Sequence, residues 1–155
     1  MNPKLLLSLA LVLSGVLSVS ARLVRSWSDA ELMKASDLVV VATPLATKDL
    51  DETNSLGWPA GGFRGVETTF KVFDAVKGMP VNDRILLHHY RYDISERSLS
   101  RGPDFVSFPQ GSTNTLVLYL IKDGTSRYAP VAGQVDSSCS IRPLPTDRPF
   151  QIGMP

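Results

Sequence analysis

Apolar and polar residues follow each other along this chain in patterns that predict a mainly β domain. One run of β-branched residues is continuous, which is typical of a strand buried on both faces. Other segments alternate between apolar and polar residues, or form apolar runs bounded by Gly, Pro and Asp-Gly turn signals. The predicted strands are residues 38–43, 66–77, 84–92, 114–122 and 127–131, with minor additional strands between residues 134 and 144.

A short helix is predicted ahead of the first strand. Ser28 and Glu31 have the spacing of a capping box, in which each side chain accepts a hydrogen bond from the other residue's backbone amide. Trp27 and Leu32 fall where a hydrophobic staple packs, and the helix is expected to end near Ser36. The predicted role of this helix is to pack against the sheet.

Two irregular stretches separate the predicted strands. Residues 47–65 are polar and rich in glycine, and we expect a long loop there. Pro44 should make the first strand bend or reach a sheet edge, because proline cannot donate to a ladder. Residues 93–113 are expected to be irregular, with a helical turn near residues 95–98.

Five strands with a break after the third, preceded by a short helix, have the order of an OB-fold. We therefore predict an all-β fold, a five-stranded OB-like β-barrel with a short N-terminal helix and minor additional strands. The barrel domain is assigned to residues 22–144, and residues 145–155 are expected to form an extended, mobile, Pro-rich tail.

The first 21 residues have the pattern of a secretory signal peptide. Lys4 precedes the apolar residues 5–17, and small residues lead to a predicted cleavage between Ala21 and Arg22. A membrane anchor is the alternative, although the apolar stretch is short against the roughly 20 residues that a bilayer core requires. We expect a secreted or periplasmic protein with no stable membrane span after cleavage.

Charge and cysteine content narrow the partners. The formal net charge of the whole chain is +1, and loss of Lys4 with the leader brings it to zero. A balanced charge gives no general attraction to nucleic acid, so no nucleic-acid partner is expected.

Cys139 is the sole cysteine. It excludes a disulfide within the chain and leaves three alternatives: a small buried side chain, a reactive thiol or an intermolecular disulfide.

Three segments resemble the netrin-module and tissue-inhibitor-of-metalloproteinase-like superfamily: Ser36 to Thr43, Thr69 to Gly78 and Asn114 to Leu120. The segment Tyr128 to Gln134, with the Ser-Asp-Leu-Val-Val start, also resembles uncharacterised secreted bacterial proteins. The match covers residues 26–144 and consists mostly of core strand residues. It therefore implies the OB-like fold rather than a function.

This chain departs from that superfamily at the residues that would inhibit a metalloproteinase. The resemblance implies zinc chelation by an N-terminal cysteine, but the mature chain would begin with Arg22. The disulfides of the superfamily are missing too, since only Cys139 is present. Inhibition by that route is not expected.

Few residues have the spacing of a catalytic or metal site. His88 and His89 are adjacent in a predicted strand and should point to opposite faces, so the pair is not expected to bind one metal. The segment Asp49-x-Asp51-x-Thr53 begins like a calcium loop but lacks the later glycine and glutamate, which favours a solvated acidic loop. We find no nucleophile elbow and no phosphate-binding glycine loop. No cofactor is expected.

The sequence-based hypothesis is an exported, non-enzymatic domain that binds a protein, peptide or glycan. Its candidate surface consists of Trp58, Phe63, Arg64, Tyr90 and Tyr92, which would place aromatic groups beside one end of the barrel. The alternative for Trp58 and Phe63 is that they fold back and plug that end. Two other functions stay open: an envelope enzyme, hydrolytic or metal-dependent, using His88 or His89, and a structural module dimerised through Cys139.

Overall fold

A computed structural model describes residues 25–58, 62–93 and 102–144 of the chain. The signal peptide predicted for residues 1–21, the tail predicted for residues 145–155 and the turn near residues 95–98 lie outside the described residues. The described elements are α2 (Asp29–Ala35), β1 (Leu38–Asn54), β2 (Phe63–Lys77), β3 (Arg84–Tyr92), β4 (Leu116–Asp123), β5 (Arg127–Pro130), the 3₁₀ helix η1 (Ser137–Ser140) and β6 (Ile141–Pro143).

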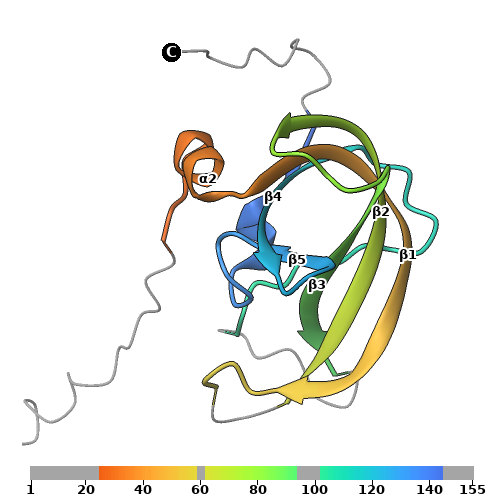
Figure 1. Ribbon diagram of the computed structural model, residues 1–155. Coiled ribbons are helices and arrows are strands. Elements are labelled where there is room, and N and C mark those ends of the chain that lie inside the picture. Colours follow the sequence, from red (N-terminus) through yellow and green to blue (C-terminus); the bar gives the residue numbers. More distant parts are fainter. Residues whose placement is uncertain (1–24, 59–61, 94–101, 145–155) are drawn as a thin grey trace, which may run out of the picture.

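The strands form a closed ring, which confirms the predicted all-β, OB-like fold (Figure 1). Neighbours around the ring are β1, β2, β3, β5 and β4, and β4 pairs back onto β1. The ring is uneven, because the parallel pairing of β3 with β5 consists of Leu87 opposite Tyr128. β6 is the predicted minor strand, and it adds to β4 outside the ring.

Two apolar clusters hold the ring together. The first fills its interior and includes Val40, Phe70, Leu87 and Leu118. The second lies between α2 and the outside of the ring, where Leu32 of α2 packs with Val39, Val117 and Tyr119. Residues 38–42 thus have apolar neighbours on both faces, as the continuous apolar run predicts.

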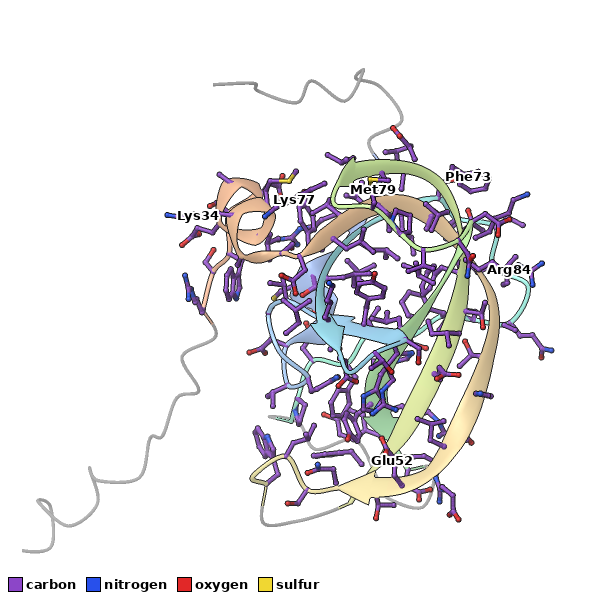
Figure 2. The ribbon with its side chains drawn as sticks, viewed as in Figure 1. Lys34, Glu52, Phe73, Lys77, Met79 and Arg84 are labelled. Carbon is purple, nitrogen blue, oxygen red and sulfur yellow. The ribbon has the colours of Figure 1, made fainter. Side chains whose placement is uncertain are left out.

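The capping box at the start of α2 is confirmed. Glu31 donates its backbone amide to the Ser28 hydroxyl, and the Ser28 amide donates to the Glu31 carboxylate at 2.9 Å. Hydrogen bonds from the Ser28 backbone and side chain, and from Arg25, lower the pKa of Glu31 to about 2. At the other end, Lys77 donates to the carbonyl of Met33 at 2.9 Å, and Figure 2 shows Lys77 beside the helix.

The first two strands are longer than predicted. β1 continues to Asn54 and β2 begins at Phe63, so the long loop predicted for residues 47–65 shrinks to residues 55–62. The reason is that residues 45–49 are all exposed, so no alternation of buried and exposed positions marks this half of β1 as a strand. The expectation for Pro44 is confirmed: pairing with β4 ends at Ala42, and the register against β2 shifts between Pro44 and Ala46.

Gly78 and Gly124 provide a matched test of how tightly the β2–β3 connection packs. Both have a φ of +75°, but a Cβ at Gly78 would lie 2.5 Å from the backbone oxygen of Asp37, whereas a Cβ at Gly124 would meet nothing within 4 Å. We expect Gly124→Ala to lower the free energy of unfolding by about 1–2 kcal/mol through backbone strain alone. Gly78→Ala should cost about 1–3 kcal/mol more because the backbone must move. Urea unfolding of both variants measures the difference, and equal losses would contradict this packing.

Candidate functional site

The five residues of the predicted aromatic surface do not form one exposed patch. Phe63 is 1% exposed, and its ring makes edge contacts with the rings of Tyr92 and Phe105. Tyr92 also donates its hydroxyl to the carbonyl of Pro103 at 2.7 Å. Tyr90 is 7% exposed. Phe63 thus lies as the plug alternative expects, packed inside the barrel end rather than presented to a ligand.

Trp58 and Arg64 are less buried than Phe63 and Tyr90. Trp58 is half-buried, and its amide donates to the Ser55 carbonyl at 2.8 Å. The turn from Ser55 to Trp58 places Leu56 at φ 49° and Gly57 at φ 80°. This left-handed backbone conformation is unfavourable for leucine. Arg64 pairs with Asp93 at 3.4 Å. Trp58, Arg64 and Tyr92 are therefore the partly exposed members of the predicted surface.

His88 is held between two carboxylates at the end of the barrel that Figure 2 marks with Glu52. Its Nε2 lies 2.6 Å from Glu52 Oε1 and its Nδ1 lies 2.8 Å from Asp123 Oδ2. Arg127 donates to the same Asp123 oxygen at 2.9 Å, and the Tyr90 hydroxyl donates to Glu52 at 3.4 Å. The pKa of Tyr90 is raised, first by burial and then by the charge of Glu52. This cluster links β1, β3, β4 and β5.

Gly65 makes room for the Glu52 side chain. A Cβ at Gly65 would overlap Glu52 Cγ and Oε1, so the Glu52 side chain lies against His88 in a space that β2 leaves open at this position. The register places Gly65 opposite Tyr90, the next residue on the same face of β3 as His88. The contact between Glu52 and His88 therefore depends on residues in three strands: Glu52 of β1, Gly65 of β2 and His88 of β3.

The geometry of the His88 cluster favours a structural role. The two carboxylates contact opposite nitrogens of one ring, so they cannot converge on one metal ion with that ring. Within residues 25–58, 62–93 and 102–144, no group of three or more His, Cys, Asp or Glu side chains is arranged to hold a metal. His88 is 7% exposed and both of its ring nitrogens have partners, so neither nitrogen is open to a substrate.

His89 points to the opposite face of β3, as predicted for adjacent strand residues. It is 2% exposed, and the edge of Phe108 packs against its ring inside the barrel. Its Nε2 lies 2.9 Å from the Thr68 hydroxyl, which lies 2.9 Å from the Thr47 hydroxyl of β1. Burial lowers the pKa of His89 to about 4; the backbone of Tyr90 opposes this shift and the neighbouring His88 adds to it.

The second half of β1 has one edge without a strand partner among the described residues. β1 pairs with β2 along its length, but its other side pairs with β4 at residues 38–42 alone. Figure 1 shows this second half running along the outside of β2, away from β4. No described residue gives a backbone hydrogen bond to that side of residues 43–54. We call this side of β1 the open edge.

A pocket lies at the start of the open edge. Its volume is about 210 Å³, and it is bounded by β1 on one side and by the segment before β4 on the other. Its lining residues are Pro44, Leu45, Ala46, Thr47, Phe108, Pro109, Gln110 and Gly111. Leu45 is 47% exposed, and Thr47 connects the pocket to the Thr68–His89 hydrogen bonds. The pocket therefore combines polar and apolar lining groups with an adjacent strand edge that has no strand partner among the described residues.

The sequence interpretation missed this pocket because its two walls are more than sixty residues apart in the chain. Pro44 was the available signal, since it marks the point where β1 loses β4 as a neighbour.

The acidic segment that begins like a calcium loop lies within β1, where Asp49 accepts two hydrogen bonds from Arg91, one at 2.7 Å. That guanidinium holds the pKa of Asp49 below its ordinary value.

Cys139 lies in η1 and is partly buried.

Among the residues that the structure describes, no helix has the length and apolar character to cross a membrane. No protein-family model matches the chain, and no curated protein matches it. The resemblance to the netrin-module superfamily and the secretory signal therefore stay predictions, and function must be argued from the geometry of the site.

A double-mutant cycle tests the dependence of the His88 contact on Gly65. We expect Gly65→Ala and Glu52→Ala each to lower the free energy of unfolding by about 1–3 kcal/mol, because each removes the carboxylate from His88. The double variant should lose less than the sum, because both changes break one interaction. Urea unfolding of the four proteins measures the coupling. Gly62→Ala is the control, since its Cβ would lie at an ordinary 3.4 Å from Thr53. Additive losses at Gly65 and Glu52 would contradict the assignment.

The buried His89 predicts a loss of stability in mild acid. In the folded state its pKa is lowered from 6.5 to about 4, so the unfolded chain binds the additional proton between these values. The free energy of unfolding should therefore fall as pH decreases from 6.5 to 4, by up to about 3 kcal/mol from this group. Urea unfolding across this range, with His89→Gln as the comparison, isolates the contribution. An identical pH dependence in both proteins would rule it out.

Proposed function

We propose that this chain is an exported, non-enzymatic binding domain that takes an extended polypeptide segment along the open edge of β1. Among the partners expected from the sequence, a peptide or an extended segment of a protein fits this site best. The observation that carries the proposal is the open edge of β1, which has no strand partner among the described residues, with the pocket at its start.

The open edge supplies the backbone groups for such binding. An unpaired strand edge presents a row of N–H and C=O groups that an added strand satisfies, which is the basis of peptide recognition by strand addition. The five consecutive residues from Leu45 to Asp49 are exposed, so a ligand reaches this part of the strand without moving other described elements. Main-chain hydrogen bonds give affinity with little dependence on ligand sequence.

The pocket supplies a side-chain preference. Leu45 and Phe108 offer apolar contacts on opposite walls, and the Thr47 hydroxyl and Gln110 add polar groups. A volume of about 210 Å³ suits one side chain rather than a whole ligand. We therefore expect an apolar anchor residue in a bound segment, with the rest of the segment recognised through its backbone.

The His88 cluster and Cys139 give less support to the other functions. An enzyme using His88 as a base would need a ring nitrogen that faces substrate, whereas both nitrogens contact carboxylates. His89 is enclosed in the barrel interior, and the Thr68 hydroxyl contacts its Nε2. The third function, a structural module dimerised through Cys139, rests on Cys139 being the sole cysteine. The partial burial of this residue adds no support for a dimer.

Binding of a displayed random-peptide library tests the proposal. Immobilised chain starting at Arg22 should enrich peptides with an apolar anchor in an extended stretch. Leu45→Asp should weaken binding of the enriched peptides at least tenfold, because it places a charge beside the pocket. Fluorescence titration of a labelled enriched peptide measures the change.

Val81→Asp is the matched control. Val81 is 90% exposed, lies in the β2–β3 connection and undergoes the same apolar-to-acidic change as Leu45→Asp. It should leave the affinity for the enriched peptide unchanged. The proposed function is wrong if no peptide is enriched, or if Leu45→Asp and Val81→Asp behave alike.

A further inference from the structure

One segment of β1 interrupts the ladder that this strand forms with β2. The pairing stops after Asp49 and resumes at Thr53, and Gly65 is the single residue of β2 between the two partners. Residues 50–52 of β1 therefore oppose one residue of β2, which is the geometry of a β-bulge. We call residues 50–52 the bulge. It lies near the far end of the open edge, before the turn that leads to β2.

Glu52 attaches the bulge to β3, at the end of the barrel where Figure 2 labels this residue. Its Oε1 lies 2.6 Å from His88 Nε2, in the space that Gly65 leaves open. The Tyr90 hydroxyl donates to the same oxygen at a longer 3.4 Å. Within the part of the chain that the structure describes, the Asp51 side chain has no hydrogen bond or ion pair. The polar attachment of the bulge to the barrel therefore depends on the His88 ring.

The contacts of the His88 ring require a proton on each of its nitrogens. An ionised carboxylate only accepts hydrogen bonds, and a neutral imidazole has a single N–H to donate. His88 has a partly exposed carboxylate at each nitrogen, Glu52 at 2.6 Å and Asp123 at 2.8 Å. Such short contacts are typical of hydrogen bonds between ionised partners. The ring therefore donates from both nitrogens, as an imidazolium.

The charges around His88 favour the same form of the ring. The titratable groups that face His88 come from five strands: Lys48 and Glu52 of β1, Glu67 of β2, Tyr90 of β3, Asp123 of β4 and Arg127 of β5. His89 points into the barrel interior instead. Both cations of this set already pair with a carboxylate, at 2.7 and 2.9 Å. The remaining negative charge is that of Glu52, and a positive His88 ring balances it.

We propose that Glu52, His88 and Asp123 form a pH-sensitive latch, which fastens the bulge to the barrel while His88 is an imidazolium and releases it when the ring becomes neutral. Histidine is the side chain whose charge ordinarily changes between about pH 5 and 8. On release, the Nε2 proton passes to water, and the lone pair left on this nitrogen faces the Glu52 carboxylate. The hydrogen bond between them is replaced by repulsion.

Glu52 is the carboxylate that moves when the latch opens. Asp123 keeps two donors, because the Nδ1–H of the neutral ring and Arg127 both still contact its Oδ2. Glu52 keeps the Tyr90 hydroxyl at 3.4 Å, and the bulge that carries it has no ladder partner in β2. The released segment is therefore the one that the strand ladder holds least.

Opening of the latch loosens the far end of the open edge. Beyond the bulge, the last pairs of β1 with β2 are Thr53 with Arg64 and Asn54 with Phe63. The bulge joins these two pairs to the rest of β1, so its release leaves them as an isolated strand end. For binding, the consequence rests on the proposed function: a peptide strand that extends to this end has an ordered template only while the latch is closed.

NMR spectroscopy at two pH values tests the latch without any ligand. In the chain from Arg22, the His88 ring signals report its protonation state. Amide exchange across the Thr53–Arg64 and Asn54–Phe63 pairs reports how firmly the strand end is held. Between about pH 5.5 and about pH 8.5, we expect the protection factors of these amides, corrected for intrinsic exchange, to fall about tenfold. Amides of β4 should keep their protection, because the closed part of the ring does not depend on the latch.

Glu52→Gln and Asp51→Asn are the matched variants, since each removes one carboxylate from the bulge. A glutamine amide both donates and accepts, so it bonds to either form of the imidazole. Glu52→Gln should therefore make the protection independent of pH. Asp51→Asn leaves the His88 contacts in place and should show the full change of the wild-type chain.

The outcomes judge the latch separately from peptide binding. Equal pH dependence in the two variants overturns the latch, and so does a wild-type chain whose protection is the same at both pH values. A loss of protection that includes β4 also overturns it, because the whole fold then opens. The direction distinguishes the latch from the buried His89, which lowers stability toward acid. None of these results uses the peptide library, so either proposal can fail while the other stands.

Discussion

The structure depends on how β1 divides its backbone pairing between two neighbours. Along residues 39–42 β1 pairs on both sides, with β2 and with β4, and this double pairing closes the ring. Pro44 lies two residues beyond Ala42, the last residue of β1 that pairs with β4. Its missing N–H therefore removes no hydrogen bond to β4. From there on β1 has β2 alone. The closed half buries Leu38, Val39, Val40 and Ala42, whereas the second half is mostly exposed.

That division explains which parts of the fold the sequence could predict. The buried half of β1 was predictable from its continuous apolar run, and β3 from an apolar segment bounded by turn signals. The predicted start of β1 at residue 38 and the predicted bounds of β3 at residues 84 and 92 agree with the structure. The continuation of β1 beyond Pro44 could not be recognised, because residues 45–49 are exposed on both faces of the strand and have no apolar period. The helix cap was predictable from Ser28 and Glu31 because its hydrogen bonds are local in sequence.

The two adjacent histidines show why the chemistry of the site was less predictable than the fold. Strand alternation correctly places His88 and His89 on opposite faces, but the surroundings of each come from distant strands. His88 receives Glu52 and Asp123, and His89 receives Thr68 and Phe108. Gly65 leaves the space that the Glu52 side chain occupies beside His88. Such contacts depend on register and on the absence of a side chain, neither of which a local pattern reveals.

If a partner strand adds to the open edge as proposed, the charges along the edge restrict where it does so. Lys48, Asp49, Asp51 and Glu52 occupy its middle and far end, and charged side chains on an edge oppose indiscriminate pairing between copies. Glu67, Arg91 and His88 engage three of these charges, so their positions are maintained by β2 and β3. The near end, from Pro44 to Thr47, is uncharged and adjoins the pocket. On the proposed function, an added strand therefore meets the pocket at this end, whereas most of the remaining edge presents charged side chains.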